Sequence, residues 1–338
     1  ALSSVRDAGL SGPIQLSGKN LKQGKNVFAV EVHQYSTNDS DLAFGASLGA
    51  TVESLPDGII LNELMAANRG SVKNGDTNPD WIELYNPTSR EIDLTGAGLG
   101  DGVSEKPTFF FPAGTRLAPQ AHLVVWCDDA KEQPGLHSGF ALDADGQNIA
   151  LWWPGDDGLK IQDAIGFGPQ ADDLSIGRSP DGAGPWALNA PTPGTANTAQ
   201  DLGSIKSLSI NEWMARPENG SDWLEIYNRS ALPVPMAGLK LSDDPTQLDK
   251  TVLPPLTFIA GNGYLRFIAD NDTNDGANHV GFRLSGRGEE IVLSDTKDKT
   301  IDSVIFAEQS RGVSEGRYPD GDKSIVTFTN SATPGQSN

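Results

Sequence analysis

The sequence Trp-Ile-Glu-Leu-Tyr-Asn at positions 81–86 returns as Trp-Leu-Glu-Ile-Tyr-Asn at positions 223–228. Each copy follows an Asn-Glu pair, at positions 62–63 in the first case and at positions 211–212 in the second. Aromatic and aliphatic residues that alternate with a polar residue are typical of a β-strand. The duplication therefore indicates one strand-rich unit that occurs twice.

Further landmarks recur in the same order at similar spacing. Asn62 and Asn211 are 149 residues apart, whereas Trp81 and Trp223 are 142 apart, so the first copy has seven more residues between these landmarks. The extra residues fall in the Gly-, Asn- and Asp-rich stretch 69–79, which is typical of a loop. One fold used twice explains this pattern. The other matched pairs keep offsets of 139 to 142: Gly98/Gly238, Leu123/Leu265, His137/His279, Asp163/Asp302, Arg178/Arg317 and Pro193/Pro334.

Each copy contains short runs of alternating apolar and polar residues, separated by Gly, Pro, Asn and Asp. No stretch keeps a 3.6-residue apolar period with caps, so helices are not expected. Strands at this spacing predict an all-β fold with two tandem β-sandwiches of roughly seven strands each. We expect the first sandwich at 58–197 and the second at 208–338, with a polar linker at 198–207 between them.

Several motifs, each present twice and in the same order, resemble those of a known family. They are the strand starts Leu61–Glu63 and Ile210–Glu212, the Asp-Trp-(Ile/Leu)-Glu-(Leu/Ile)-Tyr-Asn stretches, Gly-Leu at 98–99 and 238–239, Gly-Arg-x-Pro-Asp-Gly at 177–182 and 316–321, and Thr-Pro-Gly at 192–194 and 333–335. Both copies resemble the lamin tail domain, and the resemblance covers most of the chain. It implies an immunoglobulin-like sandwich and a non-catalytic interaction module, which in bacteria is often attached to surface or secreted enzymes.

Residues 1–55 precede the first copy and follow a different pattern. We expect one strand over Asn26–His33 and another over Leu42–Leu48. The stretches 21–34 and 40–44 resemble the closing strands of galactose-binding-like jelly rolls. The earlier strands and ligand loops of that family have no counterpart here, so the resemblance implies a short β segment without a sugar site.

The composition is acidic, because 45 Asp and Glu residues against 25 Lys and Arg residues give a net charge of −20. We expect no nucleic-acid partner, since such binding depends on basic side chains that neutralise phosphates. No apolar run approaches the ~18 residues that would suggest a transmembrane segment. The single Cys127 excludes an intrachain disulfide and a cysteine-based zinc cluster. Ala1 is not an initiator methionine, so we expect a fragment or a mature form.

Alternation along the repeated strand places Trp81, Glu83 and Tyr85 on one face, and Ile82 and Leu84 on the other. We expect the aliphatic pair to face the core. The two aromatic residues would then cover the opposite face or an edge of the sheet.

The glutamate of each Asn-Glu pair is flanked at two-residue spacing by apolar residues, so alternation places it on an apolar face. A buried carboxylate needs a partner, and Arg178 and Arg317 are the only basic residues that recur in matching motifs. Two interpretations stay open: ion pairs Glu63–Arg178 and Glu212–Arg317, or glutamates exposed at a strand end. The predicted structural motif comprises Glu63, Trp81, Glu83, Tyr85 and Arg178, and in the second copy Glu212, Trp223, Glu225, Tyr227 and Arg317.

The densest acidic loop, 270–276, reads Asp-Asn-Asp-Thr-Asn-Asp-Gly. Calcium prefers six to eight oxygen ligands, and alternating Asp and Asn can supply several. The loop is not an EF-hand, because Asp275 and Gly281 stand where that motif needs Gly and Glu. A solvated turn and a calcium site stay open, and no cofactor is required. A calcium site would use Asp270, Asp272, Asn274 and Asp275.

Trp126, Trp152 and Trp153 have no tryptophan counterparts in the second copy. Exposed tryptophans can stack on sugar rings, whereas core packing or an interdomain contact is their commoner role. These three residues therefore define a possible carbohydrate-binding surface as an alternative.

Two features resemble catalytic or metal motifs but lack the required context. The stretch 312–316 matches the G-x-S-x-G serine-hydrolase pattern, yet turn residues follow it where a helix is needed. We interpret Ser314 as a chance match. His137 and His279 correspond between the copies and are expected to bond within their own loops.

The resemblance to the lamin tail domain implies a non-catalytic interaction or scaffold module of a bacterial secreted or cell-surface protein. It would bind a protein partner or a cell-surface component through loops and edge strands. A carbohydrate-binding module and an accessory region of a hydrolytic enzyme are the alternatives.

Overall fold

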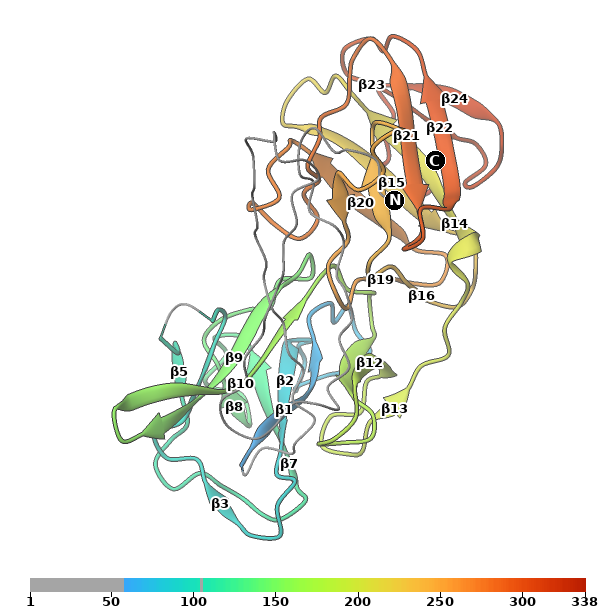
Figure 1. The fold of residues 1–338 in the computed structure, drawn as a ribbon. Coiled ribbons are helices and arrows are strands. Elements are labelled where there is room, and N and C mark those ends of the chain that lie inside the picture. Colours follow the sequence, from blue (N-terminus) through green and yellow to red (C-terminus); the bar gives the residue numbers. More distant parts are fainter. Residues whose placement is uncertain (1–57, 104–105) are drawn as a thin grey trace, which may run out of the picture. The chain divides into compact units, whose positions relative to one another are not determined.

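The computed structural model describes residues 58–103 and 106–338 (Figure 1). These residues belong to one compact unit of the chain, Ser54–Asn338. Apart from one short 3-10 turn, Ile205–Ser207 (η2), every regular element in the described ranges is a β-strand. The all-β prediction is confirmed. The β segment expected at 1–55 lies outside the described residues.

The first sandwich, coloured blue to green in Figure 1, has a seven-stranded sheet in the order β13-β12-β11-β1-β2-β7-β8. All its neighbours pair antiparallel except β7 and β8, which are parallel. Its strands are β1 (Ile60–Met65), β2 (Asp80–Tyr85), β7 (His122–Cys127), β8 (Leu136–His137), β11 (Ser175–Arg178), β12 (Trp186–Ala190) and β13 (Thr198–Ala199).

A smaller sheet in the order β10-β9-β4-β5 packs against it, and β3 pairs with β6 as a separate ribbon. Side chains from both sheets share one core, for example Ile82 from the larger sheet and Ile149 from the smaller one. These strands are β3 (Ile92–Asp93), β4 (Gly98–Gly100), β5 (Phe109–Phe110), β6 (Arg116–Leu117), β9 (Gln147–Gly155) and β10 (Gly158–Phe167).

The second sandwich, coloured yellow to red, repeats this topology with a second core of its own. Its sheets have the orders β20-β15-β14-β23-β24 and β18-β17-β21-β22, and β16 pairs with β19. The prediction of two tandem sandwiches is confirmed. The strands are β14 (Leu208–Met214), β15 (Asp222–Asn228), β16 (Val234–Pro235), β17 (Lys240–Ser242), β18 (Thr251–Val252), β19 (Phe258–Ile259), β20 (Tyr264–Ala269), β21 (Glu289–Ser294), β22 (Thr300–Phe306), β23 (Val313–Arg317) and β24 (Ile325–Thr329).

The repeated strand β2 lies in the middle of its sheet, between β1 and β7. Ile82 and Leu84 face the core as expected, and Trp81 is fully buried while Tyr85 is half-buried. Both faces of β2 are therefore covered, which explains why its pattern of burial does not alternate.

A β-bulge at the Asn of each Asn-Glu pair changes the faces that alternation predicts. Leu61 lies opposite Leu84 and Glu63 lies opposite Glu83, so Asn62 is an extra residue in β1. The second copy has the same irregularity between Ile210 and Glu212. Because a bulge shifts the pleat by one residue, Leu61 enters the core and Glu63 does not share its face. The sequence-based expectation that Glu63 interrupts an apolar face was wrong for this reason.

Residues 198–207, expected as a linker, contain two short ordered elements. Strand β13 pairs with β12 through Asn189↔Ala199 and Ala190↔Thr198. The 3-10 turn η2 is capped by Ser204, whose side chain accepts a hydrogen bond from the Lys206 backbone N–H. Because β13 belongs to the sheet of the first sandwich, this sandwich extends to Ala199, two residues into the expected linker. The start of the second sandwich at 208 remains a proposal.

Candidate functional site

Each sandwich contains a buried pair of glutamates on neighbouring strands. In the first copy, Glu63 of β1 lies directly opposite Glu83 of β2, and both are 0% exposed. In the second copy, Glu212 of β14 lies opposite Glu225 of β15, with the same burial. Like charges at facing positions destabilise a sheet, so these carboxyl groups need other partners.

The glutamates accept hydrogen bonds from the Thr-Pro-Gly turn that follows β12. Thr192 donates to Glu63 from its backbone N–H (3.1 Å) and from its hydroxyl (3.0 Å). Gly194 N–H donates to Glu83 (2.6 Å), and the Ser175 hydroxyl donates to Glu63 (2.5 Å). The second copy repeats these contacts with Ser314, Thr333 and Gly335.

The bulge asparagine connects the glutamate pair to the Pro-Asp-Gly turn. Asn62 Nδ2 donates to Glu83 (3.0 Å), and Asn62 Oδ1 accepts from Gly182 N–H (3.1 Å). Asn211 makes the matching contacts to Glu225 (3.3 Å) and Gly321 (2.9 Å). The recurrence of these motifs in the same order therefore reflects one polar cluster that is built twice.

Burial raises the pKa of these carboxyl groups above their ordinary value of 4.5. The pKa of Glu63 rises to about 7, and that of Glu83 to about 8, because burial removes water and the neighbouring carboxylate adds repulsion at Glu83. Glu225 follows with a pKa of about 8, and the pKa of Glu212 is also raised by burial. Perturbed carboxyl groups often mark active sites, but here both side chains are fully buried, and their hydrogen-bond partners lie in β1, in β11 and in the Thr-Pro-Gly turn.

The expected ion pairs of Glu63 with Arg178 and of Glu212 with Arg317 were wrong. Arg178 instead forms an ion pair with Asp163 (3.1 Å) of β10, and its Nε donates to the backbone oxygen of Leu61 (3.0 Å). Asp163 in turn accepts from the Leu61 N–H (3.0 Å). The Asp-Arg pair thus occupies the backbone N–H and C=O of the residue before the bulge, beyond the point where β1 pairs with β11.

The same arrangement recurs in the second copy. Arg317 pairs with Asp302 (3.0 Å) of β22 and donates to the backbone oxygen of Ile210 (2.7 Å). Asp302 accepts from the Ile210 N–H (2.8 Å). Each Asp-Arg pair therefore links the two sheets of its sandwich.

A comparison with family models identifies the family of this chain. The model of the lamin tail domain matches residues 53–167 and 203–307, well over half of the sequence. The chain belongs to the lamin tail domain family. Neither the curated proteins nor the solved structures gave a match. The lamin tail domain is an immunoglobulin-like fold that is typically non-enzymatic, which indicates an interaction module.

Ser314 is a strand residue of the second lamin tail domain, and its side chain binds a buried glutamate. It is the second residue of β23 and does not lie at a turn between a strand and a helix. Its buried hydroxyl donates to Glu212, as the Ser175 hydroxyl donates to Glu63. The interpretation of the G-x-S-x-G stretch as a chance match agrees with this geometry.

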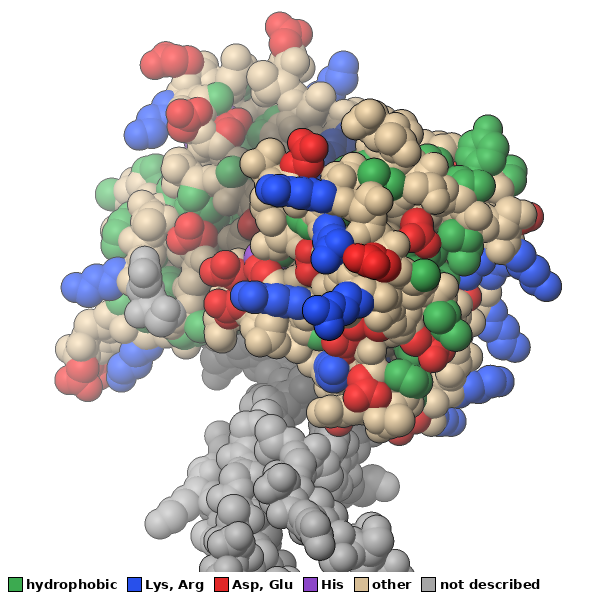
Figure 2. Space-filling view, turned by 90° about the horizontal axis from the view of Figure 1, so that it is seen from above, with side chains coloured by type: hydrophobic (Ala, Val, Ile, Leu, Met, Phe, Trp, Pro, Cys, Tyr) green, Lys and Arg blue, Asp and Glu red, His purple; other side chains and the backbone are tan. Residues whose placement is uncertain are grey.

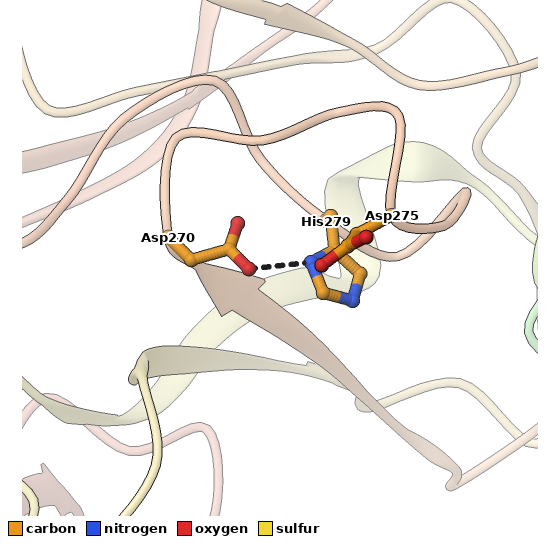
Figure 3. A group of neighbouring side chains, drawn as sticks. All are labelled: Asp270, Asp275 and His279. Carbon is orange, nitrogen blue, oxygen red and sulfur yellow. Dashed lines mark hydrogen bonds and ion pairs between the residues drawn. The ribbon is translucent and has the colours of Figure 1, made fainter.

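The paired histidines of the two lamin tail domains each contact an aspartate nine residues earlier. His137 Nδ1 bonds Asp128, and its Nε2 bonds the backbone oxygen of Gln133 (3.2 Å). His279 Nδ1 lies 2.7 Å from Asp270 Oδ2 (Figure 3). The expectation that these histidines bond within their own loops is confirmed.

The second histidine also lies beside a second carboxylate. One donor atom each from Asp270, Asp275 and His279 lies within 4.8 Å of the other two, and Figure 3 shows both carboxylates next to the imidazole Nδ1. Two carboxylate oxygens and one imidazole nitrogen form a mixed donor set of the kind that zinc and manganese accept. Gln133 stands where Asp275 would be in the first domain, an offset of 142.

The residues expected for calcium are divided between two places in this loop. Asp270 and Asp275 converge with His279, whereas Asp272 accepts hydrogen bonds from the backbone N–H (3.1 Å) and Nδ2 (3.2 Å) of Asn274. Among the described residues, Asp272 and Asn274 thus form a local turn. Calcium binding by this loop remains a proposal.

The three tryptophans of the first domain do not form one platform. Trp126 lies in β7 of the larger sheet, whereas Trp152 and Trp153 lie in β9 of the smaller sheet. All three are half-buried, and Trp153 packs against the core. Consecutive residues of a strand point to opposite faces, so Trp152 and Trp153 cannot both face one sugar chain. No feature of this geometry favours the carbohydrate alternative.

No helix in the described ranges combines the length and apolarity that a membrane crossing needs.

Asp163 and Asp302 are the important residues that sequence reasoning missed. Their offset of 139 equals that of Arg178 and Arg317, so a shared offset was the signal that could have paired them. Thr192 and Thr333 were recognised as motif residues but not as partners of the glutamates.

Proposed function

We propose that this chain is a non-catalytic interaction module of a bacterial secreted or cell-surface protein. It would contact a protein partner through loops and edge strands and hold other parts of the same protein in place, including a catalytic domain if one is attached. The lamin tail domain family supports the interaction role. Secretion and a bacterial source are part of the proposal and follow from the resemblance alone.

The observation that carries the proposal is the position of the exposed apolar side chains, most of which lie on edge strands. Ten large hydrophobic residues of the described ranges are strongly exposed, and six of them are on edge strands. Edge strands present unpaired backbone groups to which a partner strand can add, and flanking apolar side chains then contact the partner. The six are Phe110 (β5), Ile161 (β10), Val252 (β18), Ile305 (β22), and Ile325 and Val326 (β24).

The residues shared by both copies favour the same conclusion. Glu63, Glu83 and Arg178 are engaged with their own sandwich through turns and backbone groups. The motif therefore supports the fold and leaves the edges and loops for recognition.

The experiment uses charge to block strand addition. The full chain and its Ile305→Lys/Ile325→Lys variant are immobilised and exposed to cell-envelope proteins of a bacterium that carries the gene, and retained proteins are quantified. We expect a partner that the full chain retains and the variant loses, because edge lysines oppose strand pairing. Leu232→Lys is the matched control, since Leu232 is exposed (41%) in a loop. Equal retention by all three proteins contradicts the edge-strand proposal.

A second proposal concerns the loop of Asp270, Asp275 and His279. The convergence of three metal-binding groups favours a divalent metal ion that would fix this loop, either calcium or a transition metal that accepts nitrogen. Metal titration of the variants described in the Discussion tests it.

A further inference from the structure

An open cleft of about 620 Å³ lies at one end of the second sandwich. Three segments line it: the loop between β14 and β15, the end of β20 with the residues after it, and the loop between β22 and β23. Each segment contributes one arginine, namely Arg216, Arg283 and Arg311. Figure 2 shows lysine and arginine side chains gathered beside acidic ones on the face seen from above. A cleft with three guanidinium groups is unexpected in a chain with a net charge of −20.

The three arginines are held in place mainly by backbone contacts. Arg283 Nε donates to the backbone oxygen of Asp270 (2.9 Å), and Arg311 donates to that of Glu218 (3.2 Å). Within the described part of the chain, neither arginine has a carboxylate at ion-pair distance. A guanidinium has five N–H donors, so each retains several for a ligand.

Arg216 lies over a glycine that makes room for it. A Cβ at Gly286 would lie 2.3 Å from Arg216 Nε. Arg216 also donates to the backbone oxygen of Gln309 (3.3 Å). Its ion pair with Glu308 is long (3.4 Å) and exposed, so it contributes little to stability. The first domain has Ala144 in the place of Gly286. The glycine and the arginine thus belong to the second domain alone.

The first domain has no arginine at any of the three corresponding positions. The offsets of the neighbouring landmarks, 149 at Met65/Met214, 142 at His137/His279 and 139 at Arg178/Arg317, define these positions. They hold Ala67 for Arg216, Ala141 for Arg283 and Asp172 for Arg311. Because the sandwich forms without them, the three arginines are not required by the fold, and their convergence needs another explanation.

The charges around the cleft limit the kind of anion that fits. Asp222 and Asp270 also line it, and the whole chain is acidic. A densely charged polymer such as a nucleic acid or a sulfated glycan would meet this repulsion along its length. A peptide that carries one or two carboxylates among neutral residues would place only those groups at the arginines. Arginine binds a carboxylate through two parallel hydrogen bonds.

We propose that Arg216, Arg283 and Arg311 form a binding site for the carboxylate side chains of an acidic peptide segment in a partner protein. This site rests on the proposed interaction function, for which it names a contact separate from the edge strands.

The test measures fluorescence anisotropy of a short fluorescein-labelled peptide with two adjacent glutamates, and of the same peptide with glutamines. The proteins are the full chain, its Arg216→Ala/Arg283→Ala variant, which has the residues of the first domain, and Arg216→Lys/Arg283→Lys. Arg266→Ala is the control, because Arg266 is an exposed residue of β20 outside the cleft. Melting curves confirm that the variants are folded.

We expect the full chain and Arg266→Ala to bind the glutamate peptide equally. The alanine variant should bind it at least about tenfold more weakly, since charge-assisted hydrogen bonds are lost. The lysine variant should retain part of the affinity, because it keeps the charge but not the planar fork. Absence of binding, equal binding of the glutamine peptide, or unchanged binding by the alanine variant overturns the proposal. Tighter binding of a sulfated oligosaccharide than of the peptide also overturns it.

The two proposals fail in different ways. Loss of partner capture by the Ile305→Lys/Ile325→Lys variant, together with unchanged peptide binding by the arginine variants, leaves the interaction function standing without this site. Carboxylate binding that depends on the arginines, with no partner captured by the full chain, supports the site and contradicts the edge-strand proposal.

Discussion

Glu63 and Glu83 face each other across two neighbouring strands with no water-accessible surface on either side chain. Their oxygens accept from Thr192, Gly194 and Ser175, three donors that come from the end of the domain. Two facing carboxylates are stable only if their charge is reduced, chiefly by protons, and in the first domain His122 Nε2 also lies 3.9 Å from Glu83 Oε1. The pair thus makes the stability of each lamin tail domain depend on pH.

We predict that the free energy of unfolding falls as the pH rises from about 5 to about 8. The folded pKa of Glu83 and of Glu225 is about 8 against an ordinary value of 4.5, so the folded state binds more protons in this range. Stability must then decrease with pH, on the order of a few kcal/mol in total. Urea unfolding followed by tryptophan fluorescence at several pH values measures this.

Glu83→Gln and Glu225→Gln provide the control for the pH effect. Glutamine resembles the protonated acid and does not titrate, so the double variant should show a flatter pH profile. A wild-type stability that increases between pH 5 and pH 8 is the result that this explanation does not permit.

Thr192→Val should destabilise the first domain by about 1–2 kcal/mol, because the buried Glu63 loses a partly buried hydroxyl donor while the shape is kept. Thr195→Val is the matched control in the same turn. Its hydroxyl donates to the Thr192 backbone oxygen at an exposed position (3.2 Å), so its effect should stay within about 0.5 kcal/mol. Equal losses of unfolding free energy in both variants would show that the hydroxyl contact to Glu63 does not stabilise the domain.

Arg317→Ala should lower the stability of the second domain by about 3 kcal/mol or more. The change leaves Asp302 partly buried without its cation and removes the donor to the backbone oxygen of Ile210. Arg116→Ala is the comparison, since Arg116 pairs with Glu91 at the surface (3.0 Å, both more than half exposed) and should contribute little because solvent screens the pair. Chemical denaturation of both variants gives the two values, and similar losses would refute a special role for Arg317.

A divalent metal should raise the melting temperature through Asp270, Asp275 and His279. At a hundredfold excess over the dissociation constant, the stabilisation would be about 2.7 kcal/mol. We expect zinc or manganese to act on the wild type and not on His279→Ala, while His137→Ala, the first-domain control, still responds. Calcium stabilisation that survives His279→Ala but not Asp272→Ala would instead favour the all-oxygen set. No shift with any of these ions excludes both.

The sequence alone predicts the architecture because its two copies can be aligned with each other, and the alignment shows which motifs recur. Strand β2 and the Thr-Pro-Gly turns appear twice at nearly constant offset, and strand alternation then predicts two sandwiches. The face of Glu63 could not be predicted, since a single-residue bulge at Asn62 reverses the alternation without any change in composition.

The partner of Arg178 was assigned incorrectly for a related reason. A half-buried arginine needs a carboxylate nearby, but this requirement does not show which sheet supplies the carboxylate. Asp163 is in β10 of the smaller sheet, and only the packing of the two sheets brings it to Arg178. The cleft of Arg216, Arg283 and Arg311 depends likewise on three loops meeting in space, at positions where the two copies differ.

The bonds from Thr192 to Glu63 span 129 residues of sequence. During synthesis, β1 and β2 leave the ribosome long before the turn that satisfies their carboxyl groups, so the first domain cannot complete its fold until residues near 194 have emerged. An expression fragment that stops at residue 167, where the family match ends, omits β11, β12 and this turn. Such a fragment should be a substrate for proteases and chaperones, whereas one that extends to residue 199 has every donor that Glu63 and Glu83 require.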